Sequence, residues 1–208
     1  MNLVNTSTLG LFEVVNAPIH LIEEDGEAVL YPQLLSDHDS LRLFEALQTE
    51  SQWQQDSIQL FGNIHPLPRL TAWYGDLGRD YRYSGISMRA LPWSPSILEI
   101  KNVVELECGI TFNSVLLNLY RDGRDGVAWH SDDEIELGTN PVIASVSLGQ
   151  ERFFKLRHKL SRKVIKTLLP NGSLLLMRGP CQHLWEHEVP KSARQLGPRI
   201  NLTFRNIY

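Results

Sequence analysis

The sequence has few cysteines and no long apolar run, and both absences narrow what the protein can be. Only Cys108 and Cys181 occur among 208 residues. We therefore expect two free, buried thiols in a reducing compartment rather than a disulfide scaffold. No stretch of about 18 apolar residues is present, so no transmembrane helix is expected. The first residues lack a basic start followed by an apolar block, so no signal peptide is expected either.

The composition is otherwise that of a globular protein. Hydrophobic residues make up 42% and aromatic residues 9% of the chain, enough for a buried core. The length suits one domain, or one domain with an N-terminal extension. No internal repeat, linker or low-complexity segment is visible, so we predict one structural domain.

Charge is unevenly spread along the chain. The net charge is −4, yet residues 1–58 hold ten acidic residues and one basic residue, whereas residues 59–208 hold 14 acidic and 19 basic ones. A basic segment between residues 151 and 166 contains Arg152, Lys155, Arg157, Lys159, Arg162, Lys163 and Lys166. Such a segment suits a phosphate backbone. A solvated sheet edge explains it equally well.

Two helices are predicted in the first half, after an irregular stretch with one or two peripheral strands. Apolar residues recur at helical spacing over about 37–50. A second helix begins at Ser94 and Pro95, an N-cap followed by proline at the first helical position, and ends at Gly109.

From residue 111 onward the pattern changes to short apolar or alternating runs separated by turn residues. About eight strands at such spacing favour a sandwich or a double-stranded β-helix of the jelly-roll kind. The predicted fold class is therefore mainly β with flanking helices. Residues 1–57 are expected to form an extension packed on this core.

A pair of potential metal ligands lies in the run "DGVAWHSDDE". His130 and Asp132 are two residues apart, so they share one face of an extended strand. Such a pair alone is close to chance, and a third ligand must come from elsewhere. Of the distal histidines His158, His183 and His187, we favour His187 and keep His183 in reserve. Two histidines and one carboxylate suit non-haem Fe(II).

The C-terminal strand alternates strictly between polar and apolar residues. Its polar face carries Arg199, Asn201, Thr203 and Arg205. Inside a barrel mouth, two guanidinium groups could hold the two carboxylates of a small dicarboxylate. An edge strand with its polar face in water is the alternative. Asn118 and Tyr120 share one face of another predicted strand, and they could donate to the same ligand.

Two further groups suggest contact with nucleic-acid bases. Tyr81 and Tyr83 share a strand face among several arginines, as in a base-stacking surface, although tyrosines of the core would show the same spacing. Leu60, Phe61 and Gly62 lie at the tip of a predicted hairpin. Phe61 either folds back onto the core or serves as a wedge between bases.

The order N-x-Y, H-x-D, distal His and R-x-N-x-T-x-R on successive predicted strands resembles the AlkB family of Fe(II)- and 2-oxoglutarate-dependent nucleic-acid dealkylases. The similarity covers about residues 58–208 and is greatest to the animal-type branch that repairs DNA or RNA. The runs "PRLTAWYGDLG", "FNSVLLNLYRDG", "WHSDDE" and "PRINLTFR" recur there with small changes. One departure is the run "VPKSARQLGPR", where the duplex-preferring branch has an Arg-Lys-Lys cluster and this chain has only Lys191 and Arg194.

The resemblance implies a role for each motif. The implied iron ligands are His130, Asp132 and His187. The implied contacts of 2-oxoglutarate are Asn118, Tyr120 and Arg199 at its distal carboxylate, Arg205 at its chelating carboxylate, and Asn201 and Thr203 along the pocket. The implied contacts of the flipped base are Tyr81, Tyr83 and Ser84 from a lid, and Asp133 and Glu134 at the base edge. The implied finger that fills the gap in a duplex is Leu60-Phe61-Gly62.

The resemblance also implies an activity. Fe(II), with 2-oxoglutarate and O₂ as co-substrates, would support oxidative demethylation of 1-methyladenine or 3-methylcytosine, in single- or double-stranded DNA or in RNA. The base would have to be flipped out of the helix. Residues 58–110 would then form a nucleotide-recognition lid and helix, and residues 111–208 the catalytic core.

Two alternatives stay open beside this activity. One is a related oxygenase that acts on a protein or a small molecule, and the other is a non-catalytic nucleic-acid-binding jelly roll. For the predicted dealkylase we expect a monomer with no membrane partner. The expected location is the cytoplasm if the source is bacterial and the nucleus if it is eukaryotic.

Overall fold

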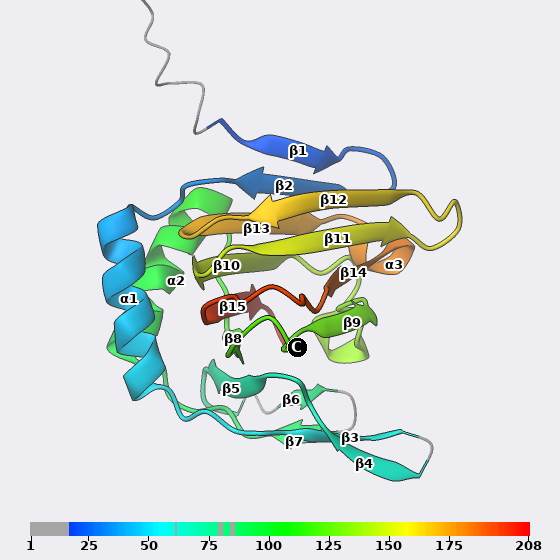
Figure 1. The fold of residues 1–208 in the computed structure, drawn as a ribbon. Helices are drawn as coiled ribbons and strands as arrows, with labels where there is room; N and C mark the ends of the chain where they lie inside the picture. The colour runs from blue at the N-terminus through cyan, green and yellow to red at the C-terminus, as the bar shows by residue number, and fades with distance from the viewer. Residues whose placement is uncertain (1–16, 61, 79–80, 84–85) are drawn as a thin grey trace, which may run out of the picture.

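Two antiparallel sheets face one another and enclose the centre of the molecule (Figure 1). The computed structural model describes residues 17–208 except residues 61, 79, 80, 84 and 85. The larger sheet consists, in order across the sheet, of β1 (Ile19–Ile22), β2 (Glu27–Tyr31), β13 (Ser173–Arg178), β10 (Ile143–Gly149), β15 (Arg199–Arg205), β8 (Ser114–Tyr120) and β5 (Leu70–Gly75). The smaller sheet consists of β12 (Val164–Leu169), β11 (Arg152–His158), β14 (Trp185–Val189) and β9 (Val127–His130).

Two hairpins form separate two-stranded sheets beside this sandwich. The first pairs β3 (Ser57–Leu60) with β4 (Asn63–Pro66), and the second pairs β6 (Tyr81–Tyr83) with β7 (Ile86–Met88). Gly62 lies in the turn of the first hairpin with a φ of +82°, a conformation that glycine adopts without strain. Figure 1 shows both hairpins on the side of the sandwich next to β5.

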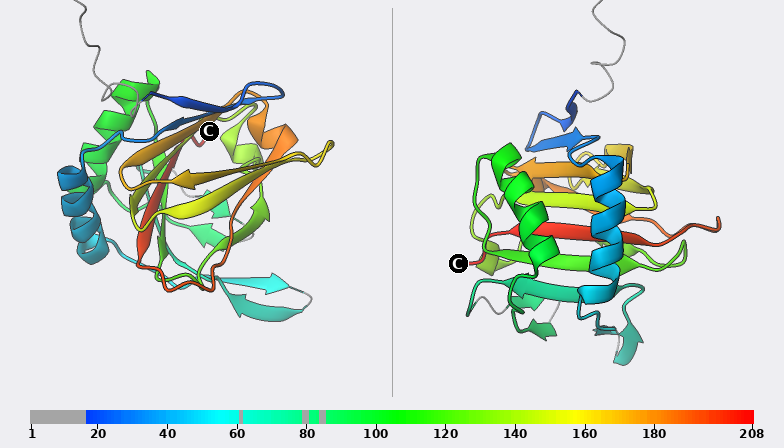
Figure 2. Two further views of the ribbon diagram at one scale, coloured as in Figure 1. Left: turned by 45° about the horizontal axis from the view of Figure 1, so that its top comes forward. Right: turned by 90° about the vertical axis from the view of Figure 1, so that its left-hand side faces the viewer.

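Two long helices, α1 (Asp37–Glu50) and α2 (Pro95–Cys108), cover the outer face of the larger sheet (Figure 2). Their predicted boundaries are confirmed because the signals are local. The Ser36 side chain caps α1 by accepting from the Asp39 amide, and Gly109 ends α2 with a φ of +65°. The remaining helical elements are the short α3 (Cys181–Leu184) and a 3-10 turn (Ile135–Leu137).

The strand alternation divides the core into two layers. On β8, Val115 and Leu117 pack with the helices, whereas Leu116 and Tyr120 belong to the layer between the sheets. The C-terminal strand β15 does the same, since its apolar residues Ile200, Leu202 and Phe204 pack toward the helices. Its polar residues therefore face the space between the sheets. The predicted jelly-roll fold with flanking helices is confirmed.

The first part of the chain belongs to the fold as well. Strand β2 pairs with β13 inside the larger sheet, and β1 adds to its edge. Cys108 and Cys181 are both free, the first half-buried and the second buried. None of the helices in the described part of the chain is long and apolar enough to cross a membrane.

Candidate active site

Three side chains that could hold a metal ion meet between the two sheets. Strand β9 pairs with β14 so that His130 lies directly opposite His187. Asp132 follows β9, and its carboxylate oxygen lies 4.0 Å from Nε2 of His130. One ligand atom from each of the three side chains lies within 4.8 Å of the others. In the described residues, no other group of His, Cys, Asp or Glu meets this condition.

The two other candidate histidines lie elsewhere. His158 is buried with its Nε2 3.3 Å from a carboxylate oxygen of Asp25. His183 accepts a hydrogen bond from the Asn140 amide at 3.3 Å. Of the distal histidines considered from the sequence, His187 is therefore the one that joins the pair.

Neighbouring groups fix the orientation of the three side chains. Nδ1 of His130 lies 2.9 Å from the carbonyl oxygen of Ala128, which leaves Nε2 toward Asp132. The Asp132 amide donates to Gln182 at 3.0 Å, and the ring of Phe154 stacks on His187 at 5.3 Å. Outer contacts of this kind hold metal ligands in one conformation.

The protonation states suit a metal site. Burial lowers the pKa of His187 to about 3, so its imidazole is neutral at ordinary pH. Burial alone would raise the pKa of Asp132, but the positive charge of the Arg205 guanidinium, 3.8 Å away, brings it below its usual value. A neutral imidazole and an ionised carboxylate are the forms that bind a metal ion.

One cavity joins these three side chains to the polar face of β15. It occupies about 500 Å³, including space open to solvent. The predicted 2-oxoglutarate contacts all line it: Asn118, Tyr120, Arg199, Asn201, Thr203 and Arg205. The metal-binding candidates and the dicarboxylate-binding candidates therefore belong to one site.

Arg199 lies at the end of the cavity that suits an anionic ligand. Its side chain is 1% exposed. One guanidinium nitrogen donates to Ser147 at 2.9 Å, and the group lies 5.1 Å from the ring of Tyr120. Its Nε and its other terminal nitrogen have no hydrogen-bond partner. A buried guanidinium with two unsatisfied donors is costly, so an anionic ligand fits this position.

The middle of the cavity is already ordered by its own hydrogen bonds. The Asn201 amide donates to the Ser145 hydroxyl at 2.8 Å and to the carbonyl of Val146 at 2.9 Å. The Thr203 hydroxyl donates to Asn201 at 3.1 Å. These bonds hold the walls of the cavity in place. The residues at the two ends of the cavity remain available to bind a ligand.

Arg69 is a cavity residue that sequence reasoning missed. It is 3% exposed and donates from Nε to the Asn118 side-chain oxygen at 2.7 Å. A single arginine before a strand carries no periodic signal, and its only signal was its place in the run "PRLTAWYGDLG". Ser145 and Ser147 on β10, and Gln182 on α3, were missed for the same reason.

The predicted base-binding residues are described only in part. Phe61 and Ser84 lie outside the described residues, and so do the side chains of Leu60, Tyr81 and Tyr83. Directly after the metal-binding candidate Asp132, Asp133 is exposed and 3.4 Å from the Lys159 ammonium. Glu134 is half-buried and lies at the start of the 3-10 turn.

Three of the seven cations of the basic segment pair with two acidic residues of β14. Arg157 and Arg162 both contact Glu186, at 2.6 and 3.3 Å, and Lys155 contacts Glu188 at 2.9 Å. For these three cations the pairing favours a solvated sheet face over a phosphate-binding surface.

Comparisons with known proteins identify the class. Residues 27–205 match the 2OG-Fe(II) oxygenase superfamily. The human protein named "Alpha-ketoglutarate-dependent dioxygenase alkB homolog 3" is 39% identical, over 96% of this chain and 71% of that protein. The human "DNA oxidative demethylase ALKBH2" is also 39% identical, over 89% of this chain and 76% of that protein.

A solved structure described as "The structure of OsALKBH1" shares the fold, with a TM-score of 0.61 over 86% of this chain and 97% of that chain, at 18% identity. The chain belongs to the 2OG-Fe(II) oxygenase superfamily and, within it, to the AlkB family. It is an enzyme that requires Fe(II), 2-oxoglutarate and O₂. The predicted family, enzyme class and cofactors are confirmed.

The extent of the similarity is larger than predicted. The family match begins at residue 27, not near residue 58, and the alignment with alkB homolog 3 spans 96% of the chain. The structural reason is that β1, β2 and α1 are integral parts of the larger sheet and its cover. Their apolar patterns carry no polar motif that could be recognised by eye.

Proposed function

We propose that the protein is an oxidative DNA demethylase that removes methyl groups from ring nitrogens of bases such as 1-methyladenine and 3-methylcytosine. The observation that carries this proposal is the single cavity in which a His-Asp-His group faces a buried arginine with unsatisfied donors. Further support comes from relatives named as a DNA oxidative demethylase and as an alkB homolog. RNA is a second substrate of the same chemistry.

The side chains at the metal end would hold Fe(II) through His130, Asp132 and His187. With 2-oxoglutarate and O₂, the bound metal supplies the oxidation of a C–H bond in the N-methyl group, after which the methyl carbon leaves as formaldehyde. The protein's own part is to position and shield the reacting groups. Phe154, stacked on His187, forms an apolar wall beside the metal position.

The other end of the cavity would bind 2-oxoglutarate. Arg199, Asn118 and Tyr120 would hold the distal carboxylate, which supplies acceptors for the two unsatisfied guanidinium donors. Arg205 would neutralise the carboxylate nearest the metal, and it already faces Asp132 at 3.8 Å. Asn201 and Thr203, fixed by their own hydrogen bonds, would line the path between the two ends.

The base would be flipped from its helix to reach this cavity, because the methylated nitrogen lies on the pairing edge. Methylation there weakens pairing, which lowers the cost of flipping. The base contacts proposed are Tyr81, Tyr83 and Ser84 from the β6–β7 hairpin, and Asp133 and Glu134 after the metal strand. The proposed finger that fills the gap in a duplex is Leu60-Phe61-Gly62 at the tip of the β3–β4 hairpin.

We propose in addition that the protein acts as a monomer on single- or double-stranded nucleic acid, in the cytoplasm of a bacterium or the nucleus of a eukaryote. Lys191 and Arg194, in the loop before β15, are cations that such a strand would contact.

The test is incubation of the purified protein with Fe(II), 2-oxoglutarate and an oligonucleotide that carries one 3-methylcytosine, as a single strand and as a duplex. We expect the oligonucleotide to lose the mass of one CH₂ unit, because a hydrogen replaces the methyl group, with release of succinate and formaldehyde. An oligonucleotide of unchanged mass, from protein shown to bind both metal and 2-oxoglutarate, would contradict the proposed substrate.

A further inference from the structure

The β3–β4 hairpin pairs with neither main sheet, so its direction depends on how its base is held. It forms a two-stranded sheet of its own. At the base, the Leu67 amide donates to the Asp56 carbonyl at 2.8 Å. The backbones of Gln54 and Thr71 exchange hydrogen bonds of 2.8 and 2.9 Å, which joins the hairpin to β5 at the edge of the larger sheet. These bonds fix one side of the base.

The other side of the base is held by three successive carbonyl groups. The side-chain amide of Gln55 donates to the carbonyls of Leu67 and Arg69. Between them, the carbonyl of Pro68 accepts from the Gly126 amide at 3.0 Å. Gly126 belongs to the loop between β8 and β9, so the segment that leaves the hairpin lies directly against that loop.

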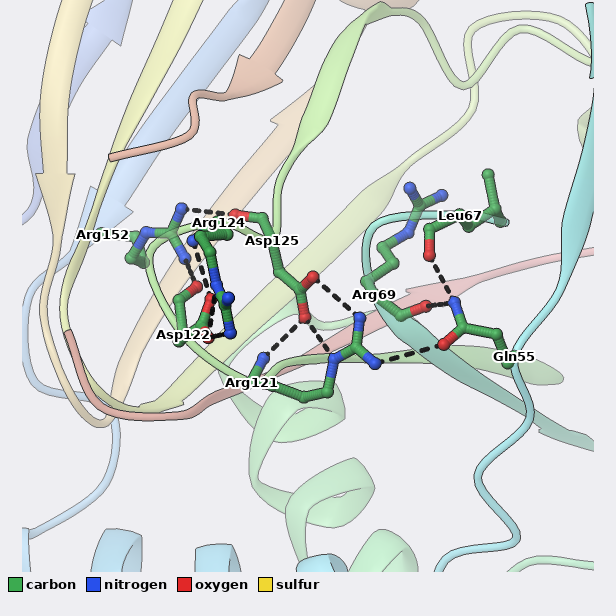
Figure 3. Close-up of polar contacts among 8 residues, drawn as sticks. All are labelled: Gln55, Leu67, Arg69, Arg121, Asp122, Arg124, Asp125 and Arg152. Carbon is green, nitrogen blue, oxygen red and sulfur yellow. Dashed lines mark hydrogen bonds and ion pairs between the residues drawn. The ribbon is translucent and has the colours of Figure 1, made fainter. Parts of the chain in front are cut away.

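The side chain of Gln55 also reaches this loop. Its oxygen accepts from a terminal guanidinium nitrogen of Arg121 at 3.2 Å. One amide group thus joins the strand that enters the hairpin to the segment that leaves it and to the β8–β9 loop. Figure 3 shows Gln55 between the backbone of residues 67–69 and the Arg121 guanidinium.

Arg121 is itself held in one conformation. Asp125, which is buried, accepts from the Arg121 backbone amide at 2.9 Å, from Nε at 2.8 Å and from a terminal nitrogen at 3.0 Å. Behind Asp125, the buried Arg152 donates to the carbonyls of Asp122 and Asp125. Figure 3 shows this series from Arg152 to Gln55. Because Asp125 accepts from three nitrogens of Arg121, the Arg121 side chain is held in one position relative to Gln55.

The same loop leads to the metal end of the cavity. It begins after Tyr120 and runs into β9, which carries His130. Arg69, whose carbonyl binds Gln55, donates from its side chain to Asn118 inside the cavity. The base of the hairpin is therefore joined by hydrogen bonds to the loop that leads to His130. Through Arg69 it is also joined to Asn118 inside the cavity.

We infer that Gln55, supported by Arg121, is a positioning residue that fixes the β3–β4 hairpin relative to the metal strand. Its consequence is selectivity for base-paired substrates, since a hairpin that fills the gap in a duplex must be aligned with the cavity. The link to duplex substrates rests on the proposed function. The positioning of the hairpin by Gln55 does not depend on the proposed function.

The variant Gln55→Ala tests the inference, with Gln54→Ala as the matched control. Gln54 is the neighbouring exposed glutamine, and the hydrogen bonds at the base are made by its backbone. Amide hydrogen exchange of residues 57–66 should be roughly fivefold faster in Gln55→Ala, the size of one net hydrogen bond. Gln54→Ala should match the parent protein. The exchange of β9 should change in neither variant.

Steady-state kinetics give the second measurement. In the Fe(II)-loaded enzyme, Gln55→Ala should raise KM for a methylated duplex roughly fivefold. The kcat, the affinity for 2-oxoglutarate and the KM for the single strand should stay as in the parent. A purely structural role would lower kcat on both substrates together.

The variant Gln55→Glu separates the two halves of the contact. It keeps an oxygen toward Arg121 and removes the donor to the Leu67 and Arg69 carbonyls, so hairpin exchange should rise as in Gln55→Ala. Unchanged exchange of residues 57–66 in Gln55→Ala, or equal acceleration in Gln54→Ala, would overturn the inference. If neither oligonucleotide is demethylated, the proposed function fails, and the exchange data still decide the positioning.

Discussion

Two regions of this protein with several basic residues lie in opposite environments in the fold. On the outer face of the smaller sheet, Lys155 and Arg157 of β11 and Arg162 of the loop after it pair with Glu186 and Glu188. Strand β15 carries Arg199 in the interior, where two of its donors have no partner. A binding site is therefore indicated by burial without compensation rather than by the density of charge.

The largest effect should come from the metal end of the interior site. The change His187→Ala should lower Fe(II) affinity by more than about 100-fold, because loss of an outer contact alone costs about 10–100-fold. Titration with Fe(II) under anaerobic conditions measures this. His183→Ala is the control, since His183 lies outside the group. A variant His187→Ala that still binds the metal would contradict the assignment.

The next effect should come from Arg199→Ala. We expect the KM for 2-oxoglutarate to rise roughly 30-fold or more, as for a buried charge that loses its partner. The free energy of unfolding without 2-oxoglutarate should not fall, because the variant removes an uncompensated buried charge. Steady-state kinetics measure the KM, and urea titration without 2-oxoglutarate measures the free energy of unfolding. A marked loss of stability in the absence of 2-oxoglutarate would show that the donors are satisfied within the protein.

A smaller effect, of opposite sign, should come from Glu186→Gln. This change removes the carboxylate that neutralises Arg157 and Arg162, so the outer face gains positive charge. Affinity for an unmethylated oligonucleotide should increase by at most about threefold at low salt and not at all at high salt. Fluorescence anisotropy at two salt concentrations measures this.

The smallest effect should come from Arg157→Ala on the same face. Arg157 pairs with Glu186 and lies 4.1 Å from the ring of Trp129, but it does not line the cavity. Partly exposed ion pairs contribute roughly 0–1 kcal/mol, so stability should change by less than that and kcat on a methylated strand should not change. A large fall in nucleic-acid affinity would mean that this face binds the substrate after all.

Sequence patterns predicted what is local and left open what depends on distant parts of the chain. The ends of α1 and α2 were predicted because caps act within one turn. The polar face of β15 was predicted because alternation belongs to the strand itself. Whether that face lay inside was open, since this depends on Ile200, Leu202 and Phe204 packing under the helices.

The order of strands and the partners of single residues were beyond prediction. Arg69 contacts Asn118 from 49 positions away in the chain, and no spacing pattern in the sequence predicts such a contact. The choice between His183 and His187 depended on the pairing of β14 with β9. The glutamates that pair with Lys155, Arg157 and Arg162 lie on β14, further along the chain, so the run of charges alone could not show these ion pairs.

Strand β9 lies at the edge of the smaller sheet, paired with β14 alone and with an irregular register between His187 and Val189. A shift of one residue in that pairing would turn His130 to the outer face. A metal ion bound by both His130 and His187 would thus link β9 to β14 and fix the register of this edge strand. Because a ligand stabilises the form that binds it, iron would contribute to the integrity of the barrel as well as to its chemistry.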